Sequence, residues 1–426
     1  MTLDIPKGVR DFLPQEKILR DFIVTTLKTT FEEFGYNPIE TPALELYETL
    51  SSKYAGGAEI LKETYKLTDN GQRELGLRYD LTVPFARIIG MNPTLKYPFK
   101  RYQIDRVWRD GPMKLGRYRE FYQCDVDIAG SQSLMADAEL LALANTAFTR
   151  LDLNFTLVVN NRKILDAILT QIGVATELQT QVILILDKLK KIGQSGVTKE
   201  LRAIGISEDQ IDSILQLVCI SGSNEEKIAS LKQLLKDTKG VEELEQVIGF
   251  AQAFGVKQLI FDVSLSRGLA YYTGLMYEAY LVDSPITSSI GSGGRYDNMI
   301  SKLAQKKEEV PAVGISFGLD PLFDAMKLLR KDNLQKSVVK LYVVPIQTQK
   351  ESAQIVAEIR NAGIKVDMDL AGKGISKNLA FANAYGIRYV LIIGGDEIAS
   401  SKLTLKDMVS GTEEKLPIKD IIKKLS

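Results

Sequence analysis

Apolar side chains recur with two different periods along the chain. Residues 15–34 place them at helical spacing, and the pattern ends before Gly35 and Asn37, with two prolines close behind. From about residue 98 the period shortens to two. Residues 99–109 and 117–130 therefore predict two strands, and the glycine-containing segment between them predicts an antiparallel hairpin.

The middle of the chain has helical periodicity. Between about 163 and 252, several segments carry apolar residues at helical spacing. Two of them begin with a capping box, Ser207 with Gln210 and Ser223 with Glu226. Strand patterns return after this stretch. We therefore expect a core of strands that encloses a helical insertion.

The last part of the chain alternates strands with helices. A polar break, DNLQKS, follows a helix expected over 321–331. Beyond it, residues 337–426 read as strand, helix, strand, helix, two strands and a final helix. This order predicts a small α/β domain with a parallel or mixed sheet.

Composition places the chain among soluble globular proteins of two or three domains. Of its 426 residues, 45% are hydrophobic and 25% charged, and 54 basic side chains balance 54 acidic ones. No segment approaches the roughly 18 consecutive apolar residues of a membrane span, and the start lacks an apolar signal core. We expect a cytoplasmic protein with no membrane partner. Cys124 and Cys219 are too few for a disulfide framework.

The chain contains no histidine. This excludes Ser-His and Cys-His pairs, histidine metal ligands and an imidazole base. No metal site built on histidine or cysteine is expected. Chemistry has to rest on carboxylates, guanidinium groups, tyrosines, backbone dipoles and bound ions.

The predicted hairpin is rich in basic and aromatic side chains. Arg109 stands at one end of its loop, and Arg117, Arg119, Glu120 and Phe121 stand at the other. Guanidinium groups suit phosphate oxygens, and an aromatic ring suits stacking on a base. A nucleotide site is one interpretation, and a solvated edge hairpin with basic side chains is the other.

Polar side chains also gather on one predicted strand face. Gln123, Asp125 and Asp127 alternate with apolar residues and so point the same way, and Asp80 and Thr82 stand before a proline. Such a group could hold an amine or a protonatable ring. It could equally be a solvated face.

Two further segments carry side chains suited to a ligand. Arg267 precedes Tyr271 and Tyr272 in an otherwise apolar stretch, and a buried arginine needs an anionic partner, either a substrate or an internal carboxylate. The glycines of 291–294 precede Tyr296 and permit either close approach of a ligand or a tight turn.

Taken in order, these segments resemble the histidyl-tRNA synthetase family of class II aminoacyl-tRNA synthetases. IPKGVRDFLP is similar to the family's opening, and YNPIETPALE to its motif 1, within about 35–50. RVWRDGPMKLGRYREFYQCDVDIAG resembles motif 2 (about 98–130), and PAVGISFGLD resembles motif 3 (about 311–328). SRGLAYYTG and GSGGRYD resemble the two stretches peculiar to the histidine enzymes.

The resemblance implies an α+β fold. Residues 1–330 would form the class II catalytic domain on an antiparallel sheet, interrupted by a helical insertion at 163–252. Residues 337–426 would form a C-terminal α/β anticodon-binding domain. It further implies ATP with Mg²⁺, L-histidine and tRNA(His) as ligands, and a homodimer formed through motif 1, in which Pro42 lies at the interface.

The resemblance also assigns roles to residues that match the family's motifs. Arg109 and Arg267 would act as catalytic residues at the ATP α-phosphate. The implied ATP-binding residues are Arg109, Arg117, Glu120, Phe121 and Arg267. The implied histidine-binding residues are Asp80, Thr82, Gln123, Asp127, Tyr271, Tyr272 and Tyr296.

The chain departs from the family pattern at two positions. Ala270 replaces a residue that is usually polar, and Pro321 stands where motif 3 usually ends in an arginine that contacts the ATP γ-phosphate. We expect Asp320 to be the N-cap of a helix that Pro321 begins, with phosphate contacts moved to Arg117, Arg295 and the amides of that helix. The loss of an arginine also suggests an alternative function, a catalytically silent paralogue that senses histidine or tRNA.

Overall fold

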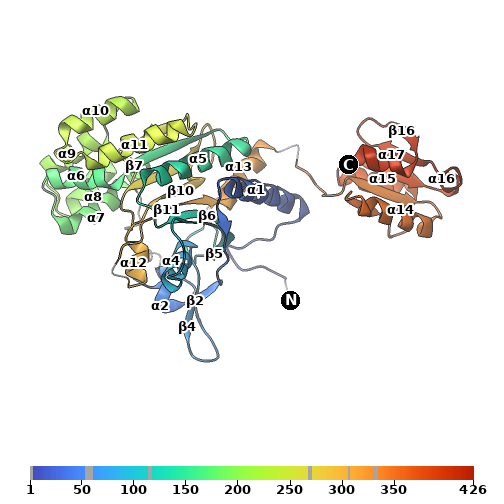
Figure 1. The fold of residues 1–426 in the computed structure, drawn as a ribbon, viewed down its shortest axis with the longest axis horizontal. Coiled ribbons are helices and arrows are strands. Elements are labelled where there is room, and N and C mark those ends of the chain that lie inside the picture. Colours follow the sequence, from blue (N-terminus) through green and yellow to red (C-terminus); the bar gives the residue numbers. More distant parts are fainter. Residues whose placement is uncertain (1–2, 53–60, 114–117, 267–270, 306–307, 331–333) are drawn as a thin grey trace. The chain divides into compact units, whose positions relative to one another are not determined.

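The computed structural model describes residues 3–52, 61–113, 118–266, 271–305, 308–330 and 334–426 (Figure 1). The chain divides into two compact units. The larger contains the residues up to Arg10 and Ile23–Leu329, and the smaller contains Asp11–Phe22 and Arg330–Ser426. Helix α1 (Pro14–Glu33) contributes to both.

The larger unit is built on a sheet that has eight strands in the described part of the chain, in the order β1-β5-β6-β11-β10-β9-β7-β8. Only the outer pairs β1–β5 and β7–β8 are parallel. The largely antiparallel sheet that the sequence predicts for this part of the chain is therefore confirmed. Its strands are β1 (Asn37–Pro38), β5 (Phe99–Trp108), β6 (Glu120–Ala129), β7 (Phe155–Asn161), β8 (Leu259–Phe261), β9 (Leu275–Leu281), β10 (Gly291–Arg295) and β11 (Ala312–Gly318).

Strands β5 and β6 form the predicted hairpin, paired from Phe99 opposite Ala129 to Trp108 opposite Glu120. The period of two decides which side chains face which way, because successive residues of a strand point to opposite faces. On β6, Cys124 and Val126 are fully buried in the core. Polar residues occupy the alternate positions and face the other way.

Helices cover the apolar face of this sheet. Helix α5 (Leu134–Arg150) packs on β7, β10 and β11, and α13 (Leu319–Leu329) packs on β6 and β11. The ring of Phe317 on β11 lies 5.5 Å from that of Phe31 and 5.3 Å from that of Phe148, centroid to centroid. These aromatic contacts fix the sheet against α1 and α5 and leave its polar face for a site.

The junction between β11 and α13 differs from the sequence prediction. The helix begins at Leu319, so Asp320 stands in its first turn and is not the N-cap, and Pro321 is the third residue. Proline is tolerated there because the first N–H groups of a helix have no intrahelical partner. The Asp320 carboxylate instead accepts hydrogen bonds from Arg10 Nη2 at 2.8 Å and from the Tyr122 amide at 3.4 Å.

Helices α6 to α9, after β7, pack around a shared apolar cluster that also takes in Tyr272 and Met276, and α11 packs on α5 and α6. Both predicted capping boxes are present, at the starts of α9 and α10. None of the helices in the described ranges is long and apolar enough to cross a membrane. The helices are α6 (Arg162–Gln171), α7 (Thr176–Leu186), α8 (Leu189–Ala203), α9 (Glu208–Val218), α10 (Asn224–Leu234) and α11 (Lys239–Ala253).

A small antiparallel sheet of order β2-β4-β3 lies in the same unit. The unit also contains three short helices, α2, α4 and α12. Helix α2 packs on β2 and β4, and α12 packs on α4. These elements are β2 (Leu44–Leu46), α2 (Tyr47–Leu50), β3 (Lys66–Thr68), β4 (Glu74–Leu77), α4 (Thr82–Met91) and α12 (Met299–Leu303).

The smaller unit is an α/β structure with a mixed sheet of order β13-β12-β14-β15-β16, as predicted. Strands β13, β12 and β14 are parallel, and β15 and β16 are antiparallel to their neighbours. The sequence prediction missed α16 and β16. The elements are β12 (Leu341–Pro345), α14 (Gln349–Asn361), β13 (Val366–Met368), α15 (Ile375–Ala384), β14 (Tyr389–Ile393), α16 (Gly395–Ser400), β15 (Leu403–Asp407), β16 (Glu413–Leu416) and α17 (Ile418–Leu425).

Candidate active site

A cavity of about 570 Å³ lies over strands β6, β10 and β11. Most of the residues predicted for the site line it, although they come from distant parts of the chain. These are Asp80, Thr82, Arg109, Phe121, Gln123, Asp127, Tyr271, Tyr272 and Tyr296.

Three predicted site residues are not among the described residues that line the cavity. Glu120 does not line the cavity, and its carboxylate accepts a hydrogen bond from the Trp108 indole N–H at 2.9 Å. Arg117 and Arg267 lie outside the described residues, as does Ala270. The roles expected of Glu120, Arg117 and Arg267 therefore stay predictions.

One wall of the cavity combines a guanidinium group with an aromatic ring. Arg109 Nε donates to the Tyr79 carbonyl at 3.0 Å, and its guanidinium carbon lies 5.2 Å from the centre of the Phe121 ring. The Arg109 amide also donates to the Arg119 carbonyl, which joins the two ends of the hairpin. A fixed cation beside a ring matches the charge of a phosphate and the face of a base.

The opposite end contains a buried carboxylate held by two partners. Asp127 Oδ1 accepts from the Tyr296 hydroxyl at 2.5 Å, and Oδ2 lies 2.5 Å from Nη2 of Arg101, the residue opposite on β5. Arg101 is wholly buried, with its guanidinium 4.5 Å from the centre of the Phe85 ring. Burial raises the pKa of Asp127, and the Arg101 charge partly offsets this rise.

Tyrosine rings close this end of the cavity. Tyr271 lies 4.7 Å from Tyr272 and 6.0 Å from Tyr296, measured between ring centroids. Burial and the Asp127 charge raise the pKa of Tyr296 well above its usual value, so its hydroxyl stays protonated and donates. The rings and the carboxylate together form a lining suited to a small polar aromatic group.

Two more carboxyl groups line the cavity. Burial raises the pKa of Asp80 to about 6 and that of Asp125 to about 7, although both residues have Arg101 nearby. Asp80 Oδ1 accepts from the Val83 amide at 3.0 Å. Asp125 is 3% exposed, and its Oδ1 atom has no hydrogen-bond partner in the described part of the chain.

The raised pKa of Asp125 predicts a pH-dependent gain in stability on replacing it by asparagine. Because the folded-state pKa lies above the unfolded value, the folded protein resists ionisation, and stability falls as pH rises from about 4 to about 7. Asp125→Asn removes this cost, so its free energy of unfolding should exceed that of the parent by about 2–4 kcal/mol at pH 8. The difference should shrink toward zero near pH 4.

Thermal or urea unfolding of both proteins across this pH range measures the difference. Asp80, whose pKa is raised for the same reason, is present in both proteins, so that only its charge interaction with Asp125 differs between them. If the difference in the free energy of unfolding did not change between pH 4 and pH 8, Asp125 would not be a buried carboxyl group with a raised pKa.

Glycines form the floor of the cavity on β10 and β11. A Cβ atom on Gly314 would lie 1.8 Å from Asp127 Oδ1, and one on Gly294 would lie 2.8 Å from the Tyr272 ring. At these two positions the main chain is approached closely by the protein's own side chains, and the approach of a ligand stays a prediction. These glycines leave the space that Asp127 and Tyr272 occupy.

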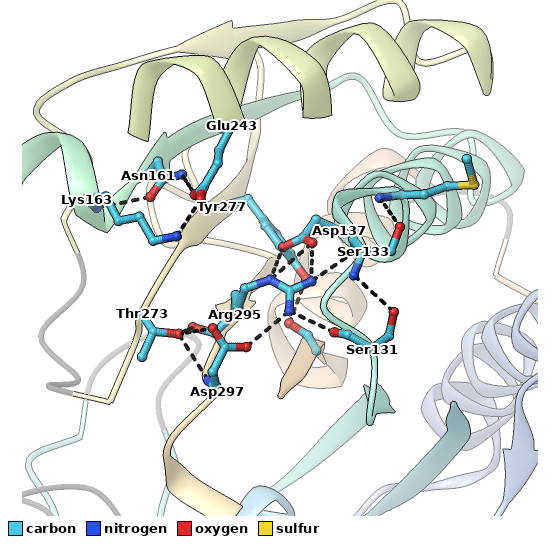
Figure 2. Close-up of polar contacts among 12 residues, drawn as sticks. Ser131, Ser133, Asp137, Asn161, Lys163, Glu243, Thr273, Tyr277, Arg295 and Asp297 are labelled. Carbon is cyan, nitrogen blue, oxygen red and sulfur yellow. Dashed lines mark hydrogen bonds and ion pairs between the residues drawn. The ribbon is translucent and has the colours of Figure 1, made fainter. Parts of the chain in front are cut away.

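Arg295 does not have the phosphate-binding role expected of it. It is 5% exposed, and its guanidinium pairs with Asp137 and Asp297 (Figure 2). Nη1 also donates to the Ser131 carbonyl and Nη2 to the Ser133 carbonyl, so all five N–H groups are directed at protein oxygens. The expectation is wrong because this arginine ties β10 to the start of α5.

The sequence prediction also missed residues that shape the site. Arg101 could have been found from the hairpin register, since it stands opposite Asp127. Asp125 was placed on the correct strand face, in a group that could hold an amine or a protonatable ring, but the family resemblance gave it no role of its own. Asp187, which lines the cavity from the end of α7, has no signal in the sequence that would connect it with residues of β6.

The fold and the cavity define a class II aminoacyl-tRNA synthetase, and comparisons with known proteins agree. The histidyl-tRNA synthetase family model matches residues 8–322, and an anticodon-binding domain model matches 340–426. Histidine–tRNA ligase 1 of Bacillus cereus is 46% identical over 97% of this chain and 97% of its own length. Histidine–tRNA ligase 2 of Shouchella clausii is 43% identical over 96% of this chain and 97% of its own length.

A solved structure gives the same result. The crystal structure of histidyl-tRNA synthetase from Nostoc sp. PCC 7120 matches with a TM-score of 0.89 and 32% identity, covering 100% of this chain and 99% of that one. The chain belongs to the histidyl-tRNA synthetase family.

Proposed function

We propose that this protein ligates L-histidine to tRNA(His) in the cytoplasm, through a histidyl-adenylate, with release of AMP and diphosphate. One observation supports this most directly. A single cavity joins a wall made by Arg109 and Phe121 to an end made by Asp127 and the tyrosines. The first suits the phosphates and base of ATP, and the second suits histidine. The relatives described above are named as ligases, and they give no support to the silent-paralogue alternative.

We assign the ligand contacts as the family resemblance implies. For ATP these are Arg109, Arg117, Glu120, Phe121 and Arg267, and Mg²⁺ would enter bound to the ATP phosphates. For histidine, Asp80, Thr82 and Gln123 would hold the α-amino group. Asp127, Tyr271, Tyr272 and Tyr296 would surround the imidazole.

The first step needs no proton transfer by the protein. The histidine carboxylate attacks the α-phosphorus of ATP, a bond to the carboxylate oxygen forms, and diphosphate leaves with the electron pair of the broken P–O bond. Charge builds on the phosphoryl oxygens, and the guanidinium groups of Arg109 and Arg267 would stabilise it. The absence of histidine from the chain is compatible with this chemistry.

The domain division and the homodimer belong to the same proposal. We propose a catalytic domain at 1–330 with its insertion at 163–252, and an anticodon-binding domain at 337–426.

Pairing of the small sheet places the leucines of β2, β3 and β4 on one face, and Leu44, Leu46 and Leu67 are 48%, 53% and 43% exposed. An exposed apolar sheet face next to Pro42 supports dimer formation through motif 1.

Histidine-dependent ATP–pyrophosphate exchange tests the function. The purified protein should catalyse exchange only when L-histidine is present, and Asp127→Ala should raise the KM for histidine at least tenfold while changing the KM for ATP far less. Thr82→Ala gives a comparison at the amino-group end. Absence of exchange with retained histidine or tRNA binding would favour the silent paralogue, and equal changes in both KM values would remove Asp127 from the amino-acid pocket.

A further inference from the structure

Asp125 is the buried carboxyl group in the cavity to which the proposed reaction gives no role. It lies on β6 between Gln123 and Asp127, on the face that lines the cavity. The side chain is almost completely buried, yet Oδ1 has no hydrogen-bond partner in the described ranges. Buried polar atoms in folded proteins are nearly always paired, so an unpaired carboxyl oxygen directed into a cavity indicates a missing ligand.

Its neighbour Asp127 is in a different situation. One Asp127 oxygen accepts from the Tyr296 hydroxyl, and the other is ion-paired with Arg101. Asp127 therefore positions the ring of Tyr296 and neutralises a buried guanidinium group. Of these two carboxyl groups, only that of Asp125 has an oxygen with neither a hydrogen bond nor an ion pair in the described part of the chain.

We propose that Asp125 contacts the bound substrate directly, through a hydrogen bond between Oδ1 and a ring nitrogen of histidine, and that it is a specificity-determining residue of the pocket. This inference rests on the proposed function and adds a residue to it. The Ser316 hydroxyl, opposite Asp125 on β11, hydrogen-bonds the same carboxyl group and holds its orientation.

Spacing along β6 favours the ring over the α-amino group. Alternate residues on a strand face are about 6.6 Å apart. Two hydrogen-bond partners on opposite edges of an imidazole stand roughly 7–8 Å apart when each bond is about 2.9 Å long. This is close to the spacing of Asp125 and Asp127 along the strand, so that the two carboxyl groups can bracket one ring.

Carboxyl chemistry also matches an imidazole ring. A neutral imidazole offers one N–H donor and one bare nitrogen acceptor. An ionised carboxylate accepts from the first, and a protonated one donates to the second. The raised pKa of Asp125 makes both forms available near neutral pH, whereas an ammonium group could pair only with the ionised form.

Isothermal titration of the full-length protein with two amino acids tests the proposal. The probes are L-histidine and L-β-(2-thienyl)alanine, whose ring has a similar size but no nitrogen. In Asp125→Leu, which keeps the side-chain shape, histidine should bind roughly ten- to a hundredfold more weakly, while thienylalanine should change by less than about threefold. The preference for histidine over thienylalanine should fall by the same factor.

A control removes a carboxylate from outside the cavity. Asp212 is exposed on helix α9, and Asp212→Leu should keep the preference of the parent within about threefold. If Asp125→Leu does not fold, Asp125→Ala replaces it, and the same ratio of histidine affinity to thienylalanine affinity is measured.

The remaining outcomes separate the two hypotheses. Equal weakening of both amino acids, or an unchanged preference for histidine, would overturn a ring contact by Asp125 and leave the proposed function standing. A parent protein that binds neither amino acid would overturn the proposed function together with this inference.

Discussion

Replacing Arg109 by methionine is expected to lower histidine-dependent ATP–pyrophosphate exchange by about 10²–10³-fold, the usual cost of losing one fixed donor at a reacting centre. Arg109 is held by the Tyr79 carbonyl and stands beside Phe121, so its charge is fixed before ATP binds. Arg109→Lys keeps the charge but loses the planar fork, and its rate should lie between those of the parent and the methionine variant.

Arg106→Met is the matched control for this experiment. Arg106 is on strand β5, three residues before Arg109, but it is half exposed and contacts Tyr122 and Glu120. Its loss should change exchange by less than about threefold, as expected for a surface ion pair. Exchange above a tenth of the parental rate in Arg109→Met would mean that Arg109 does not act on the reacting phosphate.

The second large effect concerns stability. Arg295→Met should lower the free energy of unfolding by about 3–5 kcal/mol, because it leaves Asp137 buried without its partner. The double variant Arg295→Met with Asp137→Leu replaces the pair with apolar side chains of similar size and should recover most of the loss. Urea unfolding of the parent, the single variant and the double variant measures both effects.

The double variant also decides between the two roles considered for Arg295. If the arginine only ties β10 to α5, the refolded double variant should have a KM for ATP within about threefold of the parent. A stable double variant with a strongly raised KM for ATP would restore the phosphate role expected from the sequence.

Local patterns in the sequence were sufficient for much of the fold. The hairpin of β5 and β6, and the facing of Gln123, Asp125 and Asp127, follow from a period of two over ten-residue strands. The capping boxes at Ser207 and Ser223 need only residues three positions apart. These features could be predicted because all their determinants are close in sequence.

The missed elements lack such patterns. Strand β10 consists largely of glycine and has no apolar alternation, so its glycines were interpreted as permitting close approach of a ligand or a tight turn, and no strand was predicted. Strand β16, with the sequence EEKL, is largely exposed and charged. Helix α16 has only six residues, too few to establish a helical period.

Long-range partners explain the errors within the site. Arg295 and Asp137 are 158 positions apart, and Arg10 and Asp320 are 310 apart. From sequence alone, each of these charged residues was free to be assigned to a ligand or to a cap. Only the fold shows that each of them is paired with a residue from a distant part of the chain.

The glycine floor has a consequence for how the enzyme could change its choice of amino acid. At Gly294 and Gly314 the main chain lies directly behind Tyr272 and Asp127, so neither side chain has room to move back and admit a larger ring. The glycines themselves have no side chain that could be trimmed. Evolution toward another substrate would have to begin on the tyrosine side, where Tyr271 and Tyr272 supply atoms that can be removed.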